Sequence, residues 1–162
     1  MMTETFEAVL TNRNTKIDAV DLSLIDALRH NGRTTSEELA RRVSLSRPAV
    51  VARLKRLEQN GVITAYTAVV DWEALGYSIL AFVRIRTSSH CRETARFIMS
   101  LSDPSVIIEE CHRTTGEWCL LLKVRATSPH TLEALLDRIR DEGTVSATMT
   151  TLALSTLNYF EP

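Results

Sequence analysis

The first third of the chain contains three short stretches in which apolar residues recur every three or four positions. This spacing places the apolar side chains on one face of a helix. In the first stretch the apolar positions are Val20, Leu24, Ile25 and Leu28. Asp18 lies at the start of this stretch, where its carboxylate is predicted to cap a helix, and Gly32 is predicted to end that helix.

Two further helices are predicted, with a turn of about three residues between them. Thr35 and Glu38 form a capping box that begins the second helix, whose apolar side is Leu39, Ala40 and Val43. Ser44 stands in the turn, where a positive φ is often needed. Ser46 caps the third helix, Pro48 suits its first turn, and its apolar side is Val50, Leu54 and Leu57. A short helix, a turn and a longer basic helix are typical of a helix-turn-helix.

The third helix is predicted to enter the major groove of DNA by its N-terminal end. Small side chains there allow close approach to base edges, and arginines reach phosphates or guanine. An unspecialised three-helix bundle is the alternative, but the caps, the small Ala40 between the helices and the outward arginines favour DNA binding. The residues predicted to contact DNA are Thr35, Ser36, Ser46, Arg47, Ala49, Ala52, Arg53 and Arg56.

The rest of the chain changes to a pattern of strands and helices. Residues 62–70 are partly alternating and β-branched, which predicts a strand or wing, and a short polar hinge follows at 71–76. The order that follows is β-α-β-β-α-β, typical of a ferredoxin-like domain. The predicted strands are Ile79–Arg86, Val106–Arg113, Trp118–Arg125 and Val145–Leu157; the helices are Arg92–Leu101 and one opened by Ser128 and Pro129. The whole is an α+β fold.

The third of these strands predicts an oligomer. Its alternate residues Trp118, Leu120, Leu122 and Val124 share one side of the sheet, and Cys119, Leu121, Lys123 and Arg125 share the other. Two helices cover only one side of a four-stranded sheet, so the apolar residues on the second side need a partner. We expect a homodimer.

Charge and composition refine this picture. The 162 residues carry a net charge of −1, yet eight basic and only three acidic side chains lie between Arg29 and Asn60. Such a cluster attracts a polyanion. Three cysteines make no disulfide framework, and neither a signal peptide nor a membrane-spanning run is expected, so we predict a cytoplasmic protein. The expected domains are a flexible leader (1–16), a DNA-binding domain (17–70), the hinge and a second domain (77–162).

Several motifs together resemble the Lrp/AsnC family, also called feast/famine regulators. They are Ile17-Asp18 with Asp21, Asn31-Gly32-Arg33, Glu38-Leu39-Ala40, Leu45-Ser46, Arg53-Leu54, Arg56-Leu57-Glu58, Gly61-Val62-Ile63 with Tyr66, Leu75-Gly76-Tyr77, Cys111-His112 with Thr115-Gly116, Leu121-Leu122-Lys123-Val124, and Val145 with Thr148 and Thr150. They cover nearly the whole chain from Ile17 onwards. The resemblance implies a winged helix-turn-helix domain followed by a RAM-type effector and oligomerisation domain.

The resemblance also implies partners. Family members dimerise, their dimers often assemble further, and many bind an amino acid at the seam between dimers. The matching positions here are Thr115, Gly116, Glu117, Trp118, Cys119, Thr148 and Thr150. Many relatives carry acidic residues at the positions of Glu117 and Cys119, and this chain retains only the first. No cofactor is predicted beyond such an amino-acid effector.

The cysteines and histidines offer two alternative kinds of site, a zinc site and a catalytic nucleophile. A zinc site at Cys111 and His112 with His90 and Cys91 is not predicted, because adjacent strand residues point to opposite faces. If Thr115-Gly116 is a two-residue turn, His112 lies opposite Cys119, which predicts a packed pair rather than a nucleophile, with a redox-sensing thiol at Cys119 as a minor alternative.

No catalytic constellation emerges, so no enzyme is predicted. Trp118 is expected to pack between subunits or to stack on Arg113. The leading hypothesis is a sequence-specific transcription regulator that binds double-stranded DNA. An architectural DNA-wrapping protein, an effector-independent regulator and a stand-alone metabolite-binding or enzymatic module remain the alternatives.

Overall fold

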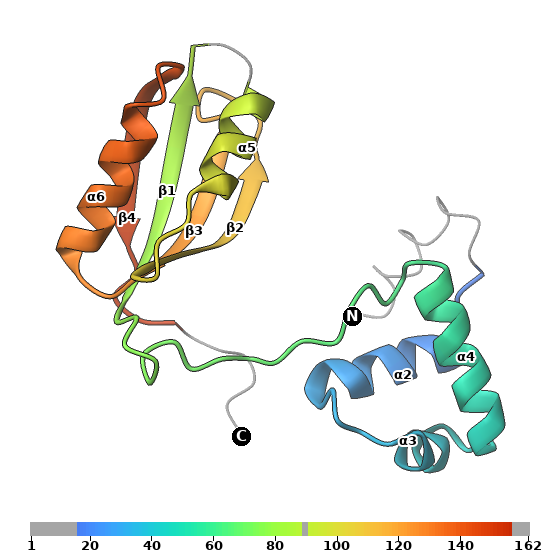
Figure 1. Ribbon diagram of the computed structural model, residues 1–162. Helices are drawn as coiled ribbons and strands as arrows, with labels where there is room; N and C mark the ends of the chain where they lie inside the picture. Colours follow the sequence, from blue (N-terminus) through green and yellow to red (C-terminus); the bar gives the residue numbers. More distant parts are fainter. Residues whose placement is uncertain (1–15, 89–90, 157–162) are drawn as a thin grey trace. The chain divides into compact units, whose positions relative to one another are not determined.

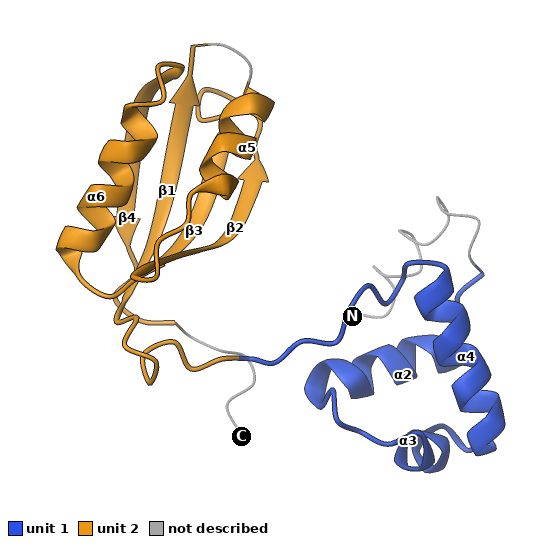
Figure 2. Cartoon of the chain, in the orientation of Figure 1, with its two compact units in different colours: residues 1–69, 162 blue, residues 70–161 orange. Residues whose placement is uncertain are grey.

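The computed structural model describes residues 16–88 and 91–156. The chain divides into two compact units, residues 1–69 with 162 and residues 70–161 (Figure 2). The expected leader (1–16) lies outside the described residues except for Lys16. None of the described helices is long and apolar enough to cross a membrane.

The first unit contains three helices, α2 (Ala19–His30), α3 (Ser36–Val43) and α4 (Arg47–Gln59) (Figure 1). The three predicted caps are confirmed. Asp18 accepts a hydrogen bond from the Asp21 amide, Thr35 forms its capping box with Glu38, and Ser46 accepts from the Ala49 amide. The first helix ends differently from the prediction, because Asn31, in an extended conformation, is the C-cap in place of Gly32.

The turn between α3 and α4 has the predicted left-handed residue. Ser44 has φ 55° and ψ 40°, a conformation that is strained for most residues with a side chain. It directs the chain from α3 into α4, and Leu45 packs against the core that the three helices share. The buried members of that core are Leu24, Ala27, Leu39, Ala40 and Val50.

The wing predicted over residues 62–70 is wrong in this structure: after α4 these residues form no strand. A strand needs a neighbouring strand to receive its backbone hydrogen bonds, and no described strand pairs with these residues. Residues 71–76, the predicted polar hinge, include a compact turn. The amides of Leu75 and Tyr77 both donate to the Trp72 carbonyl, and the two aromatic rings meet edge to face at 5.7 Å.

The second unit is the predicted ferredoxin-like arrangement (Figure 1). Its strands are β1 (Ile79–Thr87), β2 (Val106–Arg113), β3 (Leu120–Ala126) and β4 (Val145–Leu152), and its helices are α5 (Cys91–Ser100) and α6 (Pro129–Arg140). The sheet is antiparallel throughout, in the order β2-β3-β1-β4. Leu157, the predicted end of the last strand, lies outside the described residues, and β4 itself ends at Leu152.

Both helices lie on the same side of the sheet, where they bury its apolar residues. In β3 the predicted alternation is confirmed, since Leu120, Leu122 and Val124 are fully buried. Trp118 is not part of this series because β3 begins only at Leu120. The opposite side of the sheet carries exposed Phe82 and Met149, which lie on the two adjacent strands β1 and β4.

The connection between β2 and β3 is longer than the predicted two-residue turn. Arg113 pairs with Leu120, so six residues, 114–119, form the loop. His112 therefore lies opposite Leu121, and the predicted pair of His112 with Cys119 is wrong. The difference arises because the Thr114 amide donates to the Cys119 carbonyl at 3.0 Å and the Thr114 hydroxyl donates to the Trp118 carbonyl, which closes a wider loop.

Candidate DNA-binding and effector sites

The outward side of α4 is the candidate DNA-binding surface. Its exposed residues include Arg47, Pro48, Val51, Ala52 and Lys55. Arg47 and Lys55 make no ion pair or side-chain hydrogen bond with any described residue. Two unpaired cations on one exposed helix side retain their full charge for an external anion.

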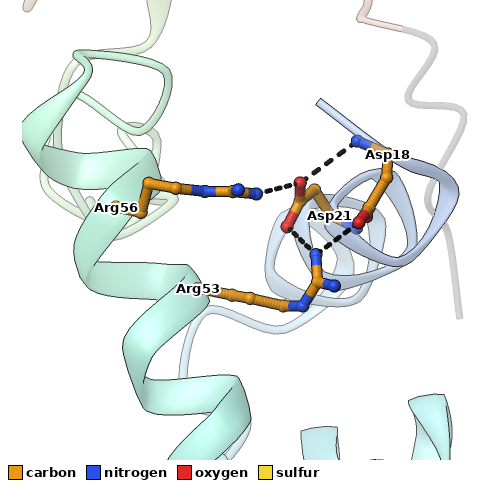
Figure 3. Close-up of polar contacts among 4 residues, drawn as sticks. All are labelled: Asp18, Asp21, Arg53 and Arg56. Atoms are coloured by element: carbon orange, nitrogen blue, oxygen red, sulfur yellow. Dashed lines mark hydrogen bonds and ion pairs between the residues drawn. The ribbon is translucent and has the colours of Figure 1, made fainter. Parts of the chain in front are cut away.

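Asp21 lies at the centre of a charged network between α2 and α4 (Figure 3). Its side chain is fully buried, and it accepts from Arg53 at 2.9 Å and from Arg56. The same Arg53 nitrogen donates to Asp18 at 2.6 Å. A buried carboxylate is tolerated only when such partners satisfy it. The network therefore fixes the distance and rotation of α4 relative to α2.

The network also affects the first turn of α2. The Asp21 amide donates to the Asp18 carboxylate, and together with Arg53 it lowers the pKa of Asp18 below its usual value. The two aspartates raise the pKa of the Arg53 guanidinium in return. Asp18 thus acts both as the helix cap and as a partner of α4.

This arrangement determines where two of the predicted DNA-contact residues point. Arg53 and Arg56 were expected to reach outward, but both guanidinium groups turn towards α2 and pair with Asp21 (Figure 3). The side chain of Arg53 is only 28% exposed. Attraction to a buried, otherwise unpaired carboxylate exceeds the gain from pointing into water. In this structure Arg53 positions the helix rather than extending from it.

The other predicted contact residues lie around the start of α3 and α4. Thr35 and Ser46 are exposed, although each side chain is also used as an N-cap. Ser36 and Ala49 are half-buried beside them, and Ala52 is exposed. Two further exposed residues of α4, Val51 and Lys55, were not among the predicted contacts; Val51 lies at the flank of the stripe formed by Val50 and Leu57, and Lys55 lies further round the helix.

A second candidate site lies at one end of the sheet. Arg86, near the end of β1, forms an ion pair with Glu117 of the 114–119 loop, and its guanidinium lies 5.8 Å from the centre of the Trp118 ring. Arg86 also donates to Ser146 at 3.3 Å. The alternative that Trp118 stacks on Arg113 is therefore wrong; Arg86 takes that place. Gly116 has φ +92°, which only glycine adopts without strain, and this sets the bend of the loop.

The predicted effector residues fall into two groups. Thr115 to Cys119 belong to the loop whose Glu117 and Trp118 contact Arg86, whereas Thr148 and Thr150 lie on β4. Thr148 pairs with Ile85 across the sheet, on the side that the helices cover, and accepts from Arg140 at 3.2 Å. Within residues 16–88 and 91–156, no hydrogen bond or ion pair joins either threonine to the loop.

The cysteines and histidines were also singled out by the sequence. Cys111 pairs with buried Leu122 and His112 with Leu121, so the two side chains lie on opposite sides of the sheet. His112 contacts the Glu110 carboxylate at 2.7 Å. His90 lies outside the described residues. No group of three metal-binding side chains occurs in the described part of the chain.

Comparison with known domains accounts for both units. Residues 17–58 match the AsnC-type helix-turn-helix domain, and residues 80–161 match the Lrp/AsnC ligand binding domain. The HTH-type transcriptional regulator LrpA of Mycobacterium tuberculosis is 36% identical over 145 residues, which cover 88% of this chain and 93% of LrpA. These relatives are DNA-binding regulators of transcription rather than enzymes.

Solved structures of similar proteins point to the same family. The structure of Bacillus subtilis LrpC superposes with a TM-score of 0.79 at 29% identity, covering 90% of this chain and 99% of LrpC. A feast or famine regulatory protein from M. tuberculosis, complexed with L-methionine, superposes with a TM-score of 0.80 at 34% identity, covering 88% and 95% of the two chains. The chain therefore belongs to the Lrp/AsnC family of helix-turn-helix, DNA-binding transcriptional regulators.

Proposed function

We propose that this regulator acts in the cytoplasm as a homodimer that binds a defined DNA sequence through its paired α4 helices, and that an amino acid modulates its assembly. The proposed mode of DNA binding rests on the residues exposed on the outward side of α4. Arg47 and Lys55 supply unpaired positive charge there, and Val51 and Ala52 leave room for base edges. The Asp21 network holds this surface away from α2.

Dimerisation is supported by the uncovered side of the sheet. Phe82 and Met149 are 37% and 44% exposed there, on neighbouring strands. On β2 and β3 the same side carries ion pairs such as Arg125 with Glu109 at 2.9 Å. A second copy would cover the apolar part and would present a second α4. Two such helices would enter successive major grooves about 34 Å apart.

Sequence-specific binding can be separated from architectural wrapping by selecting the protein's preferred sites from a pool of random DNA. A sequence-specific regulator enriches one site with two related halves. Specific sites are bound roughly 10³- to 10⁷-fold more tightly than random DNA. Enrichment of no sequence, with similar affinity for all DNA, would support the architectural alternative instead.

The selected site also tests Val51, whose side chain is 46% exposed on the outward side of α4. The only apolar group that bases present in the major groove is the C5-methyl of thymine. We expect that replacing one contacted thymine by uracil weakens binding roughly fourfold, the value of one buried methyl group. The same replacement should have no effect on DNA binding by the Val51→Ala variant. If every thymine-to-uracil change affected both proteins equally, Val51 would not contact the bases.

The amino-acid effector is supported by the charges of Arg86 and Glu117. A free amino acid carries a carboxylate and an ammonium group, and this arginine and glutamate offer a complementary pair next to the Trp118 ring. Both side chains are exposed enough to exchange their mutual contact for contacts to a ligand. We propose that the loop 114–119 and Arg86 form one wall of the effector site.

Calorimetric titration with the standard amino acids checks this proposal. Arg86→Ala should weaken binding of the amino acid that the unmodified protein binds by roughly 10- to 100-fold, because a hydrogen bond to a charged group is lost. Arg96→Ala is the matched control, since Arg96 is exposed on α5 and makes no ion pair with described residues. If the two variants bound the amino acid with equal affinity, Arg86 would not be part of the effector site. No heat with any amino acid would favour an effector-independent regulator.

A further inference from the structure

Two of the three cysteines lie together at the end of the loop 114–119, where Cys119 is its last residue. Cys91 is the first residue of α5, and Cys119 directly precedes β3. The Cys91 thiol donates to the backbone carbonyl of Cys119 at 3.3 Å, and the Cys119 thiol shares a hydrogen bond with the Thr87 hydroxyl, also at 3.3 Å. Both cysteines are half-buried, so small solutes reach them.

The surroundings make the two thiols chemically different. Burial raises the pKa of Cys91, and its contact with the Cys119 thiol raises it further, against the opposing effect of Arg113. Burial also acts to raise the pKa of Cys119, but hydrogen bonds from Thr87 and Cys91 outweigh it and lower this pKa below the usual value of a thiol. The thiolate is the reactive form of cysteine. Cys119 is thus the better nucleophile, and Cys91 remains a thiol beside it.

We propose that Cys91 and Cys119 form a redox-sensitive pair that hydroperoxides convert into an intramolecular disulfide. In the first step the Cys119 thiolate attacks one peroxide oxygen, the O–O bond breaks, and the peroxide is reduced to water or an alcohol. Sulfur is oxidised to sulfenic acid. In the second step Cys91 sulfur attacks Cys119 sulfur and the S–S bond forms. The sulfenic hydroxyl leaves as water with the proton from Cys91.

The disulfide would change the candidate effector site. It would join the beginning of α5 to the residue that follows Trp118, and so restrain the loop whose Glu117 pairs with Arg86. This consequence rests on the proposed function of that loop; formation of the disulfide does not. Oxidation is therefore expected to weaken amino-acid binding roughly tenfold, as the loss of about one hydrogen bond would.

Peptide mapping tests the pair directly. Trypsin places the three cysteines in separate peptides, residues 87–92, 97–113 and 114–123. After treatment of the full chain with one equivalent of hydrogen peroxide and alkylation, we expect a linked pair of the first and third peptides that dithiothreitol separates. Cys111 should be recovered alkylated, because it packs against the core and burial raises its pKa. A link that includes Cys111, or no link at all, would overturn the proposal.

Single variants assign the roles. Cys91→Ser should accumulate a sulfenic acid at Cys119 that dimedone traps, and Cys119→Ser should form no link. Cys111→Ser is the control and should behave like the unmodified protein. The assignment would be contradicted if dimedone trapped a sulfenic acid at Cys91 in Cys119→Ser as fast as it trapped one at Cys119 in Cys91→Ser.

The regulatory consequence is measured by titrating L-methionine into the reduced and the oxidised protein. Weaker binding after oxidation supports the switch, whereas equal binding overturns the switch and leaves the effector site standing. If neither L-methionine nor any other standard amino acid binds to the reduced protein, the effector proposal fails and the peptide map alone decides on the disulfide.

Discussion

Replacing Asp21 by alanine is expected to destabilise the three-helix unit by about 3 kcal/mol. The side chain of Asp21 is fully buried and accepts hydrogen bonds from Arg53, Arg56 and the Asp18 amide. Its removal deletes the charge-assisted hydrogen bonds that join α2 to α4 and the acceptor of the Asp18 amide, and it leaves a cavity where the buried carboxylate was. Such a loss is large compared with the 5–15 kcal/mol that stabilises a typical domain.

Amide hydrogen exchange on the full chain measures this effect unit by unit. Peptides from α2 and α4 should exchange roughly 100-fold faster in Asp21→Ala, whereas peptides from the sheet should not change. Asp26→Ala is the control. Asp26 is 52% exposed and pairs with Arg42 on the surface, where an ion pair contributes less than about 1 kcal/mol. Equal exchange in the two variants would mean that the Asp21 network does not stabilise the unit.

The parts of this fold that follow from short-range sequence were predictable. The capping box of Thr35 and Glu38 spans three residues, and any sequence window that contains the helix start contains both partners. The left-handed conformation at Ser44 follows from the tight connection between two helices. The alternation of buried residues in β3 likewise follows from the two-residue period of a strand.

The role of Arg53 was not predictable in the same way. Asp21 and Arg53 are separated by 32 residues, and no local pattern links them. The periodicity of α4 places Arg53 at the border of the buried stripe, where an arginine can turn towards either water or a neighbouring helix. The choice depends on whether a carboxylate lies opposite, and that requires the packing of α2 against α4.

The loop 114–119 shows a different limit. A threonine–glycine pair between two apolar runs is a reasonable two-residue turn, and that length would have placed Cys119 in β3 opposite His112. The register is set instead by hydrogen bonds within the loop, from Thr114 to Trp118 and Cys119, and by the irregularity of β2 between Ile108 and Glu110. This register places His112 opposite Leu121, two residues beyond the partner that a two-residue turn gives, so the loop is longer while the buried side of β3 is unchanged. The contact of Arg86 with Trp118 and Glu117 therefore required the structure.

Arg47 and Arg53 are expected to differ in how their loss changes the salt dependence of DNA binding. Arg47 is exposed and has no ion-pair partner among the described residues, so we assign it a phosphate contact. Each such contact releases counterions and contributes about 0.9 to the slope of log K against log salt concentration. A homodimer has two copies, so Arg47→Ala should reduce the slope by about 2 and weaken binding roughly 10- to 100-fold at moderate salt.

Arg53→Ala should also weaken binding, but for another reason. Its guanidinium pairs with Asp18 and Asp21, so we expect it to contact no phosphate and to release no counterion on binding. The slope should then remain within error of the unmodified protein, while α2 and α4 exchange faster. Titrations of the selected DNA site at several salt concentrations separate the two roles, because a positioning residue changes the affinity and a contacting residue changes the affinity and the slope. If Arg53→Ala lowered the slope as much as Arg47→Ala, the Asp21 network would open on DNA, and Arg53 would be a contact residue after all.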